Sequence, residues 1–286
     1  MAKKLVRVVA WTFAVLVGVV AYIYVEGRPP KGQPQYVAMG SSYAAGPAVT
    51  QEDAKSPWFC GRSRDNYAHQ LAKLRGLSLV DVSCGGATTE DILGGGLLMQ
   101  APQINAVTAE TELVTMTIGG NDVHFVGNTM ALACDDHTPW YVRLIGGCKT
   151  LSLEAMQQAL PKVHDHLIAI IDSVHQRAPK ARMVLVTYPV VFPQVGTCRQ
   201  LGLTDAEVAQ MRLLGEKLAE VTAAAAKERG ALLMDAKTVT EGHDVCAEYA
   251  WINSTHPEGG LLKAPLHPTL AGMTAIAKGL NSLLGQ

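Results

Sequence analysis

Five short apolar segments alternate with helix-forming segments along most of this chain, and this alternation constrains the fold more than any other feature. Each apolar segment has the length and composition of a strand that is buried on both faces. Strands that alternate with helices form a parallel sheet with helices on both sides. We therefore predict a three-layer α/β domain around a five-stranded parallel sheet. The predicted strands are residues 36–39, 77–82, 112–118, 182–187 and 232–235.

Helix signals lie between these strands. Capping residues predict helices over residues 65–75 and 204–229, and a last helix is expected over residues 269–284. Residues 153–178 have the amphipathic pattern of one long helix. Residues 123–151 show no clear period and contain two cysteines. We interpret them as a disulfide-tied insertion and a candidate lid over the active site.

The amino terminus carries a membrane signal. Lys3, Lys4 and Arg7 precede residues 8–25, an uncharged and mostly apolar run of 18 residues that is just long enough to span a bilayer. The same pattern describes a cleavable secretory signal, for which residues 19–21 are the only passable site. We favour an uncleaved signal anchor, with a cleaved signal peptide as the alternative.

This interpretation divides the chain into three parts. Residues 1–26 form the signal anchor or signal peptide, residues 27–35 an extended linker rich in glycine and proline, and residues 36–286 the folded domain. By the positive-inside tendency the basic end stays in the cytoplasm, so the folded domain lies outside.

Six cysteines agree with an exported domain. An even number of cysteines in such a chain predicts three disulfides, for which 15 pairings exist. No pair has the Cys-x-x-Cys spacing of zinc or redox sites, which argues against a metal site. Sequence neighbours give the simplest set of pairs: Cys60–Cys84, Cys134–Cys148 and Cys198–Cys246.

Polar and glycine residues follow three of the predicted strands. Ser42 follows the first strand through Gly40 and opens a stretch of small residues, Gly86 follows the second strand, and Asn121 the third. Strand ends in a parallel sheet share one edge, so these residues can converge where α/β proteins bind ligands. Taken alone, Ser41 or Ser42 is better explained as a helix cap than as a catalytic residue.

With these blocks the chain resembles the SGNH (GDSL-type) serine hydrolases over about residues 36–286. It is most similar to the secreted actinobacterial esterase and lipase branch, which carries three disulfides. The blocks are Gly40–Tyr43, Gly86, Gly119–Asp122 and His267–Pro268 before the last helix. Ser41 stands where the family usually has the aspartate of its GDS signature. The family fold is a flavodoxin-like sandwich, in agreement with the alternation of strands and helices.

The resemblance implies a role for each site residue. Ser42 is the nucleophile, with Ser41 as its competitor, and His267 is the base, with His256 as its competitor. The oxyanion hole consists of the Ser42 N–H, the Gly86 N–H and the Asn121 side-chain amide. The aspartate that the family often has three residues before its histidine is replaced here by Ala264. We therefore expect a dyad, in which the main-chain carbonyl of Ala264, or one close to it, orients His267.

The implied function is an extracytoplasmic serine ester hydrolase that cleaves acyl esters of lipids or cell-envelope glycans through an acyl-enzyme on Ser42. It should need no metal or organic cofactor and act as a monomer, either held in the membrane by residues 8–25 or secreted. Two alternatives are a sugar O-acetyl esterase and a non-catalytic envelope-binding protein that kept the fold. With 24 basic against 25 acidic residues and no basic patch in the body, nothing indicates nucleic-acid binding.

Overall fold

A five-stranded parallel sheet forms the centre of the molecule. The computed structural model describes residues 2–28, 32–136, 138–256 and 263–285. The sheet has the order β2-β1-β3-β4-β5, and every pair of neighbouring strands is parallel. This is the flavodoxin-like order, and it confirms the predicted fold class. The strands are β1 (Tyr36–Gly40), β2 (Leu79–Asp81), β3 (Leu113–Thr117), β4 (Arg182–Val186) and β5 (Leu232–Met234).

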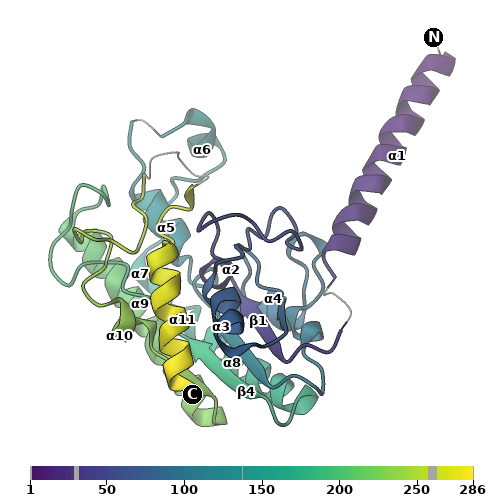
Figure 1. Cartoon of the computed structure of the whole chain (residues 1–286). Helices are drawn as coiled ribbons and strands as arrows, with labels where there is room; N and C mark the ends of the chain where they lie inside the picture. Colours follow the sequence, from purple (N-terminus) through teal and green to yellow (C-terminus); the bar gives the residue numbers. More distant parts are fainter. Residues whose placement is uncertain (1, 29–31, 137, 257–262, 286) are drawn as a thin grey trace.

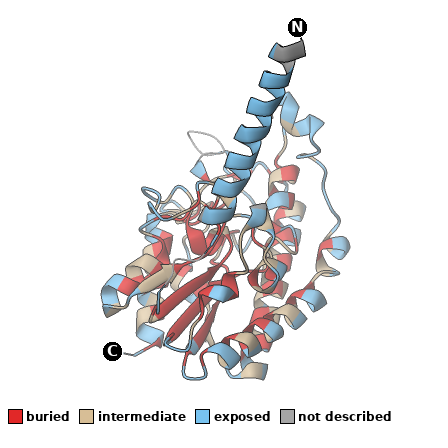
Figure 2. Ribbon diagram, turned by 90° about the vertical axis from the view of Figure 1, so that its right-hand side faces the viewer, coloured by how far each residue is buried: buried red, intermediate tan, exposed pale blue. Residues whose placement is uncertain are grey.

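The sheet separates two hydrophobic cores. Helices lie on both faces of the sheet, as Figures 1 and 2 show. Side chains of a strand alternate between its two faces, and β1 follows this rule. Val37 and Met39 belong to one core, whereas Tyr36 and Ala38 belong to the other. Helices α3 (Tyr67–Arg75), α10 (Ala236–Thr240) and α11 (Leu270–Leu283) cover the second core.

The first core is the larger one and is covered by the helices between β2 and β5. Helices α8 and α9 pack against each other here and bury their apolar faces on the sheet. The helices on this side are α4 (Thr89–Leu93), α5 (Phe125–Leu132), α7 (Leu153–Gln157), α8 (Leu160–Arg177) and α9 (Asp205–Arg229), with two 3-10 helices, η1 (Leu97–Met99) and η2 (Gln103–Ala106).

The prediction of one helix over residues 153–178 was wrong. The structure divides this segment into α7 and α8, and Pro161 lies in the first turn of α8. Proline has no N–H group, and its ring would clash with a carbonyl of the preceding turn. A helix therefore restarts just before Pro161 instead of running through it.

Residues 123–151 contain two helices, α5 and α6 (Trp140–Leu144). The Cys134–Cys148 disulfide closes the loop that carries α6. The other two disulfides join Cys60 to Cys84 and Cys198 to Cys246, so all three link neighbours in the sequence.

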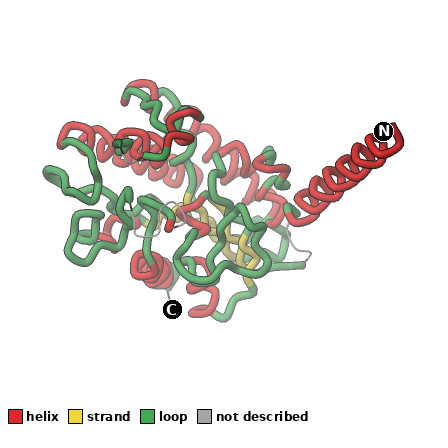
Figure 3. Tube along the Cα trace, turned by 90° about the horizontal axis from the view of Figure 1, so that it is seen from above, coloured by secondary structure: helices red, strands yellow, loops and turns green. Residues whose placement is uncertain are grey.

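The amino-terminal helix α1 (Ala2–Glu26) projects from the body, as Figure 3 shows from above. Within the described residues, the segment Val6–Val25 is long and apolar enough to cross a membrane, and none of its residues is buried in the body. The base of α1 is nevertheless joined to the body, because the Ala101 N–H donates to the Gly27 carbonyl at 3.0 Å.

Candidate active site

The turn after β1 places two serines at the carboxyl edge of the sheet. Gly40 ends β1 with φ of 129°, a backbone conformation that favours glycine. A Cβ at this position would lie 2.3 Å from the Thr117 carbonyl oxygen of β3. Ser41 is the N-cap of helix α2 (Ser42–Ala45), and Ser42 is the first helical residue. The close approach of β1 and β3 therefore requires glycine directly before the serines.

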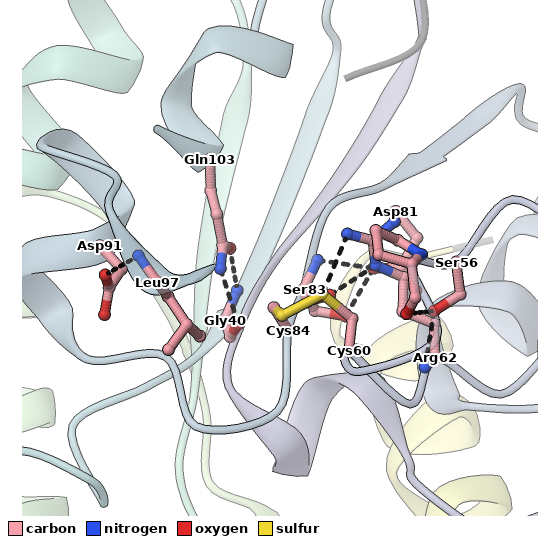
Figure 4. Close-up of a disulfide and its surroundings, with 11 residues drawn as sticks. Gly40, Ser56, Cys60, Arg62, Asp81, Ser83, Cys84, Asp91, Leu97 and Gln103 are labelled. Atoms are coloured by element: carbon pink, nitrogen blue, oxygen red, sulfur yellow. Dashed lines mark hydrogen bonds between the residues drawn. A yellow bond between two sulfur atoms is a disulfide. The ribbon is translucent and has the colours of Figure 1, made fainter. Parts of the chain in front are cut away.

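The side chain of Gln103 holds this turn in place, as Figure 4 shows beside the Cys60–Cys84 disulfide. Its Oε1 accepts from the Gly40 N–H at 2.7 Å, and its Nε2 donates to the Gly40 carbonyl at 3.0 Å. Strand β2 ends at Asp81, so the amide of Gln103 takes the place of a neighbouring peptide group beside the end of β1. Sequence reasoning missed Gln103, because an isolated glutamine in an irregular segment gives no motif.

Ser42 and His267 are paired across the site. The Nε2 atom of His267 lies 2.7 Å from the Oγ of Ser42. The Nδ1 atom of His267 lies 2.7 Å from the carbonyl oxygen of Pro265. A carbonyl can only accept, so this contact requires the proton on Nδ1 and leaves Nε2 to accept from the serine hydroxyl.

The expected acceptor, Ala264, is therefore corrected to Pro265. The chain takes a left-handed conformation at Ala264 (φ 47°) and again at Leu266 (φ 62°), which folds it tightly in front of His267. In this turn the Ala264 carbonyl accepts from the His267 main-chain N–H at 3.2 Å and from the Asn253 Nδ2 at 3.2 Å. The Pro265 carbonyl is left facing the ring.

The histidine ring is buried and braced. Tyr43, the residue after Ser42, donates from its hydroxyl to the Leu266 carbonyl at 2.5 Å, and its ring centroid lies 4.9 Å from that of His267. The Asn253 N–H donates to the His267 carbonyl at 3.0 Å. Burial lowers the pKa of His267 below its ordinary value, although the carbonyls of Pro265 and Ala264 act in the opposite direction. The ring is therefore neutral, as a proton acceptor must be, across the physiological range.

Three groups that can donate hydrogen bonds belong to the residues that line the cleft at Ser42. Its own N–H lies in the first turn of α2, where N–H groups have no partner within the helix. The Gly86 main chain and the Asn121 side chain line the same cleft as Ser42 and His267. The Asn121 Nδ2 donates one hydrogen to the Ala87 carbonyl at 2.8 Å. That bond fixes the amide and leaves its second hydrogen for a ligand.

Asp122 supports the loop that carries Gly86. Its carboxylate accepts from the Thr89 N–H at 3.0 Å and from the Thr89 hydroxyl at 2.5 Å. Burial raises the pKa of Asp122, and the bonds from Thr89 oppose this effect. Thr89 begins α4, so Asp122 ties the end of the β3 turn to the helix that follows Gly86.

The cleft has a volume of about 390 Å³ and a mostly apolar wall. A larger cavity of about 470 Å³ runs along the edge strand β2, but its lining of mixed charges includes neither Ser42 nor His267. The smaller cleft is therefore the candidate site. Besides Ser42, Gly86, Asn121 and His267, its wall consists of Pro47, Val126, Gly127, Met130, Ala264 and Pro265.

The two competing residues lie elsewhere. Ser41 is 1% exposed, and its hydroxyl lies 3.4 Å from both the Thr117 carbonyl and the Tyr188 hydroxyl, beneath the site. The Tyr188 hydroxyl also accepts from the Gly120 N–H at 2.8 Å, and burial raises the pKa of Tyr188 to about 12. His256 is exposed and contacts Thr255 at 3.1 Å. The structure therefore brings Ser42 together with His267. Ser41 and His256 do not take part in this pair.

A serine and a histidine are paired here at the switch point of a parallel sheet, where the connections after β1 and β3 run to opposite faces. This is the arrangement of an α/β serine hydrolase. Comparison with known proteins gives the family. Residues 38–275 match the GDSL-like Lipase/Acylhydrolase family, and the chain belongs to it. It is accordingly a lipase or esterase.

Three relatives illustrate the similarity. The chain is 33% identical to Lipase 2 of Streptomyces coelicolor over 264 residues, which cover 87% of this chain and 85% of that protein. The solved structure of an extracellular lipase from Streptomyces rimosus superposes with a TM-score of 0.71 at 28% identity, covering 87% of this chain and 98% of that one. A phospholipase A1 from Streptomyces albidoflavus gives a TM-score of 0.70 at 25% identity, covering 88% and 99%.

Proposed function

We propose that this protein is an extracytoplasmic ester hydrolase in which Ser42 forms an acyl-enzyme and His267 is the base. The observation that carries the proposal is the 2.7 Å contact between Ser42 Oγ and His267 Nε2, next to the main chain of Gly86 and the amide of Asn121. At this distance the Ser42 hydroxyl can transfer its proton to His267 Nε2, because the other ring nitrogen, Nδ1, is bonded to a carbonyl.

The reaction has two steps. Ser42 Oγ attacks the ester carbonyl as His267 Nε2 takes its proton, and the oxyanion accepts from the Ser42 N–H, the Gly86 N–H and the Asn121 amide. Collapse breaks the ester bond, and His267 returns the proton to the leaving alcohol. A water molecule then loses a proton to His267 and attacks the acyl carbon, and Ser42 regains the proton as the acid leaves.

Within the described residues, no carboxylate is hydrogen-bonded to the ring of His267. Pro265 orients the ring and supplies a partial charge, whereas a carboxylate would add a full one to stabilise the imidazolium. The site is therefore proposed to work as a dyad. Its intact nucleophile and base favour an enzyme over a non-catalytic binding protein.

The substrates are proposed to be acyl esters of lipids or cell-envelope glycans. The apolar wall from Pro47, Val126, Met130 and Pro265 suits an acyl chain better than it suits a sugar ring, which favours a lipid ester over a sugar O-acetyl group. Three disulfides support a place outside the cytoplasm. Residues 1–26 are proposed to anchor the protein in the membrane, and residues 27–35 to link this anchor to the folded domain. Residues 36–286 are proposed to form the catalytic domain, which acts as a monomer.

The test uses the full chain and an alkyl fluorophosphonate, which labels activated serines. We expect labelling and turnover of a short p-nitrophenyl ester by the native protein, and the loss of both in Ser42→Ala. Ser41→Ala is the matched control and should still be labelled. Labelling that persists in Ser42→Ala, or a native protein that neither labels nor turns over esters, would refute the proposal.

A further inference from the structure

The loop closed by Cys134 and Cys148 presents a group of large apolar side chains to solvent. Trp140 is 74% exposed, Leu144 75% and Ile145 79%, and Tyr141 between them is 51% exposed. No residue of α6 is buried. We call these four residues the apolar tip. Contiguous exposed apolar side chains on a braced loop indicate an interaction surface.

The chemistry of the apolar tip fits a lipid bilayer. Tryptophan and tyrosine favour the boundary between lipid headgroups and acyl chains, and leucine and isoleucine favour the acyl region below. Arg143 is the only charged residue in the sequence from Thr138 to Cys148, and its guanidinium donates to the Asp135 carbonyl at the base of the loop. The two acidic residues of the loop, Asp135 and Asp136, follow Cys134 at its base. The apolar tip itself therefore carries no acidic group, and the cation beside it suits anionic lipid.

The position of the apolar tip agrees with that of the helix proposed to span the membrane. Figure 1 shows α1 and α6 projecting from the same side of the body, with α5 beneath α6. The base of α1 is docked on the body: the Ala101 N–H donates to Gly27, and a Cβ on Gly27 would lie 2.4 Å from the Gln100 Nε2. This contact limits how the body can turn relative to the bilayer.

We propose that the apolar tip inserts into the outer leaflet of the membrane that α1 spans, as a second contact of the same chain. Helix α5, which provides Val126, Gly127 and Met130 to the wall of the catalytic cleft, leads directly into the loop of the apolar tip. The cleft is thereby held at the lipid surface. The substrates are acyl esters of the lipids in that leaflet, an inference that rests on the proposed function.

The contact is tested by tryptophan quenching in vesicles of phosphatidylcholine and phosphatidylglycerol with brominated acyl chains. The full chain is reconstituted with Trp11→Phe, so that α1 contributes no signal, and is compared with Trp11→Phe/Trp140→Phe. We expect quenching of the Trp140 emission. If brominated lipid leaves the Trp140 emission unchanged, the proposal is overturned. The same result is expected if the apolar tip binds a protein instead of lipid.

The consequence for the substrate is tested with Trp140→Ser/Leu144→Ser/Ile145→Ser. We expect about ten-fold slower hydrolysis of vesicle phospholipid, with turnover of a soluble p-nitrophenyl ester within about two-fold of the native rate. Val195→Ser/Tyr249→Ser removes exposed apolar groups elsewhere (89% and 73% exposed) and should change neither rate. Native-like hydrolysis of vesicle lipid by the triple variant would refute the inference about substrate. A native protein inactive on the soluble ester would refute the proposed function, while quenching would still measure the contact.

Discussion

Gln103→Met is expected to destabilise the protein and to slow catalysis, although Gln103 lies outside the cleft. Methionine keeps the length and nearly the shape of glutamine but loses both bonds to Gly40. The Gly40 carbonyl keeps the Cys84 N–H as a donor at 3.0 Å, whereas the Gly40 N–H is paired through Gln103. An unpaired buried N–H costs about 1–3 kcal/mol, and the second lost bond adds about 1 kcal/mol.

The expected loss is therefore about 2–4 kcal/mol of unfolding free energy. For a domain of this size each kcal/mol lowers Tm by about 2–4 °C, which gives a decrease of about 4–16 °C. A shift of the Gly40 turn also moves Ser42 relative to His267, and a displacement near 1 Å can cost about 100-fold in rate. We expect kcat for a p-nitrophenyl ester to fall by about ten- to 100-fold.

Thermal unfolding under non-reducing conditions and ester kinetics on the full chain measure both effects. Gln210→Met, at an exposed position of α9, is the matched control and should change neither Tm nor kcat. Gln103→Glu keeps an acceptor for the Gly40 N–H but sets a carboxylate oxygen against the Gly40 carbonyl, so it should also lose stability. A Gln103→Met protein with native Tm and native kcat would show that the turn is held by other contacts.

Three further predictions concern the chemistry. Asn121→Ala should lower kcat by about 10²–10³ with little change in KM, as expected for a donor to the oxyanion; an unchanged kcat would remove Asn121 from the oxyanion hole. His267→Ala should lose several orders of magnitude in kcat, close to the loss in Ser42→Ala, whereas no single Asp or Glu replacement, Asp122→Asn included, should come near it. A carboxylate variant as inactive as His267→Ala would make the site a triad. Because burial lowers the pKa of His267, the acid limb of kcat/KM should lie below pH 6.5. Because the unfolded chain binds this proton more readily, the free energy of unfolding should also decrease as the pH falls below 6.5. An acid limb of kcat/KM above pH 6.5 would contradict the burial argument.

The fold was largely predictable because its signals are local. Short apolar runs, the glycine after β1 and the capping box of Thr204 and Glu207 each report a backbone conformation that their neighbours reinforce. The long helix predicted over residues 153–178 failed because its apolar period continues across Pro161, where the missing N–H decides the outcome. The apolar period of a segment indicates which helix face is buried. It does not indicate where the backbone lacks an N–H group for a helical hydrogen bond.

The candidate site was predictable only where a motif marks it. Ser42, Gly86, Asn121 and His267 follow strands or precede a helix, so their positions in the sheet follow from the sequence order. The groups that hold them could not be found in this way. Gln103 reaches Gly40 from 63 residues away, and the carbonyl that faces His267 depends on two left-handed residues that are not glycine, Ala264 and Leu266. Tertiary packing fixes both.

The Cys60–Cys84 disulfide also bears on when the protein can act. Cys84 lies two residues before Gly86, and the Gly85 N–H donates to the Cys60 carbonyl at 2.9 Å, so the bridge holds the loop that carries Gly86, a proposed oxyanion donor. In the reducing cytoplasm this bridge does not form, and the loop lacks its covalent tie. A newly made chain would then be a poor catalyst on the inner leaflet of its own cell and would mature only after export. The bridge would thus serve as a safeguard, because it couples hydrolytic competence to the compartment where the esters are to be cleaved.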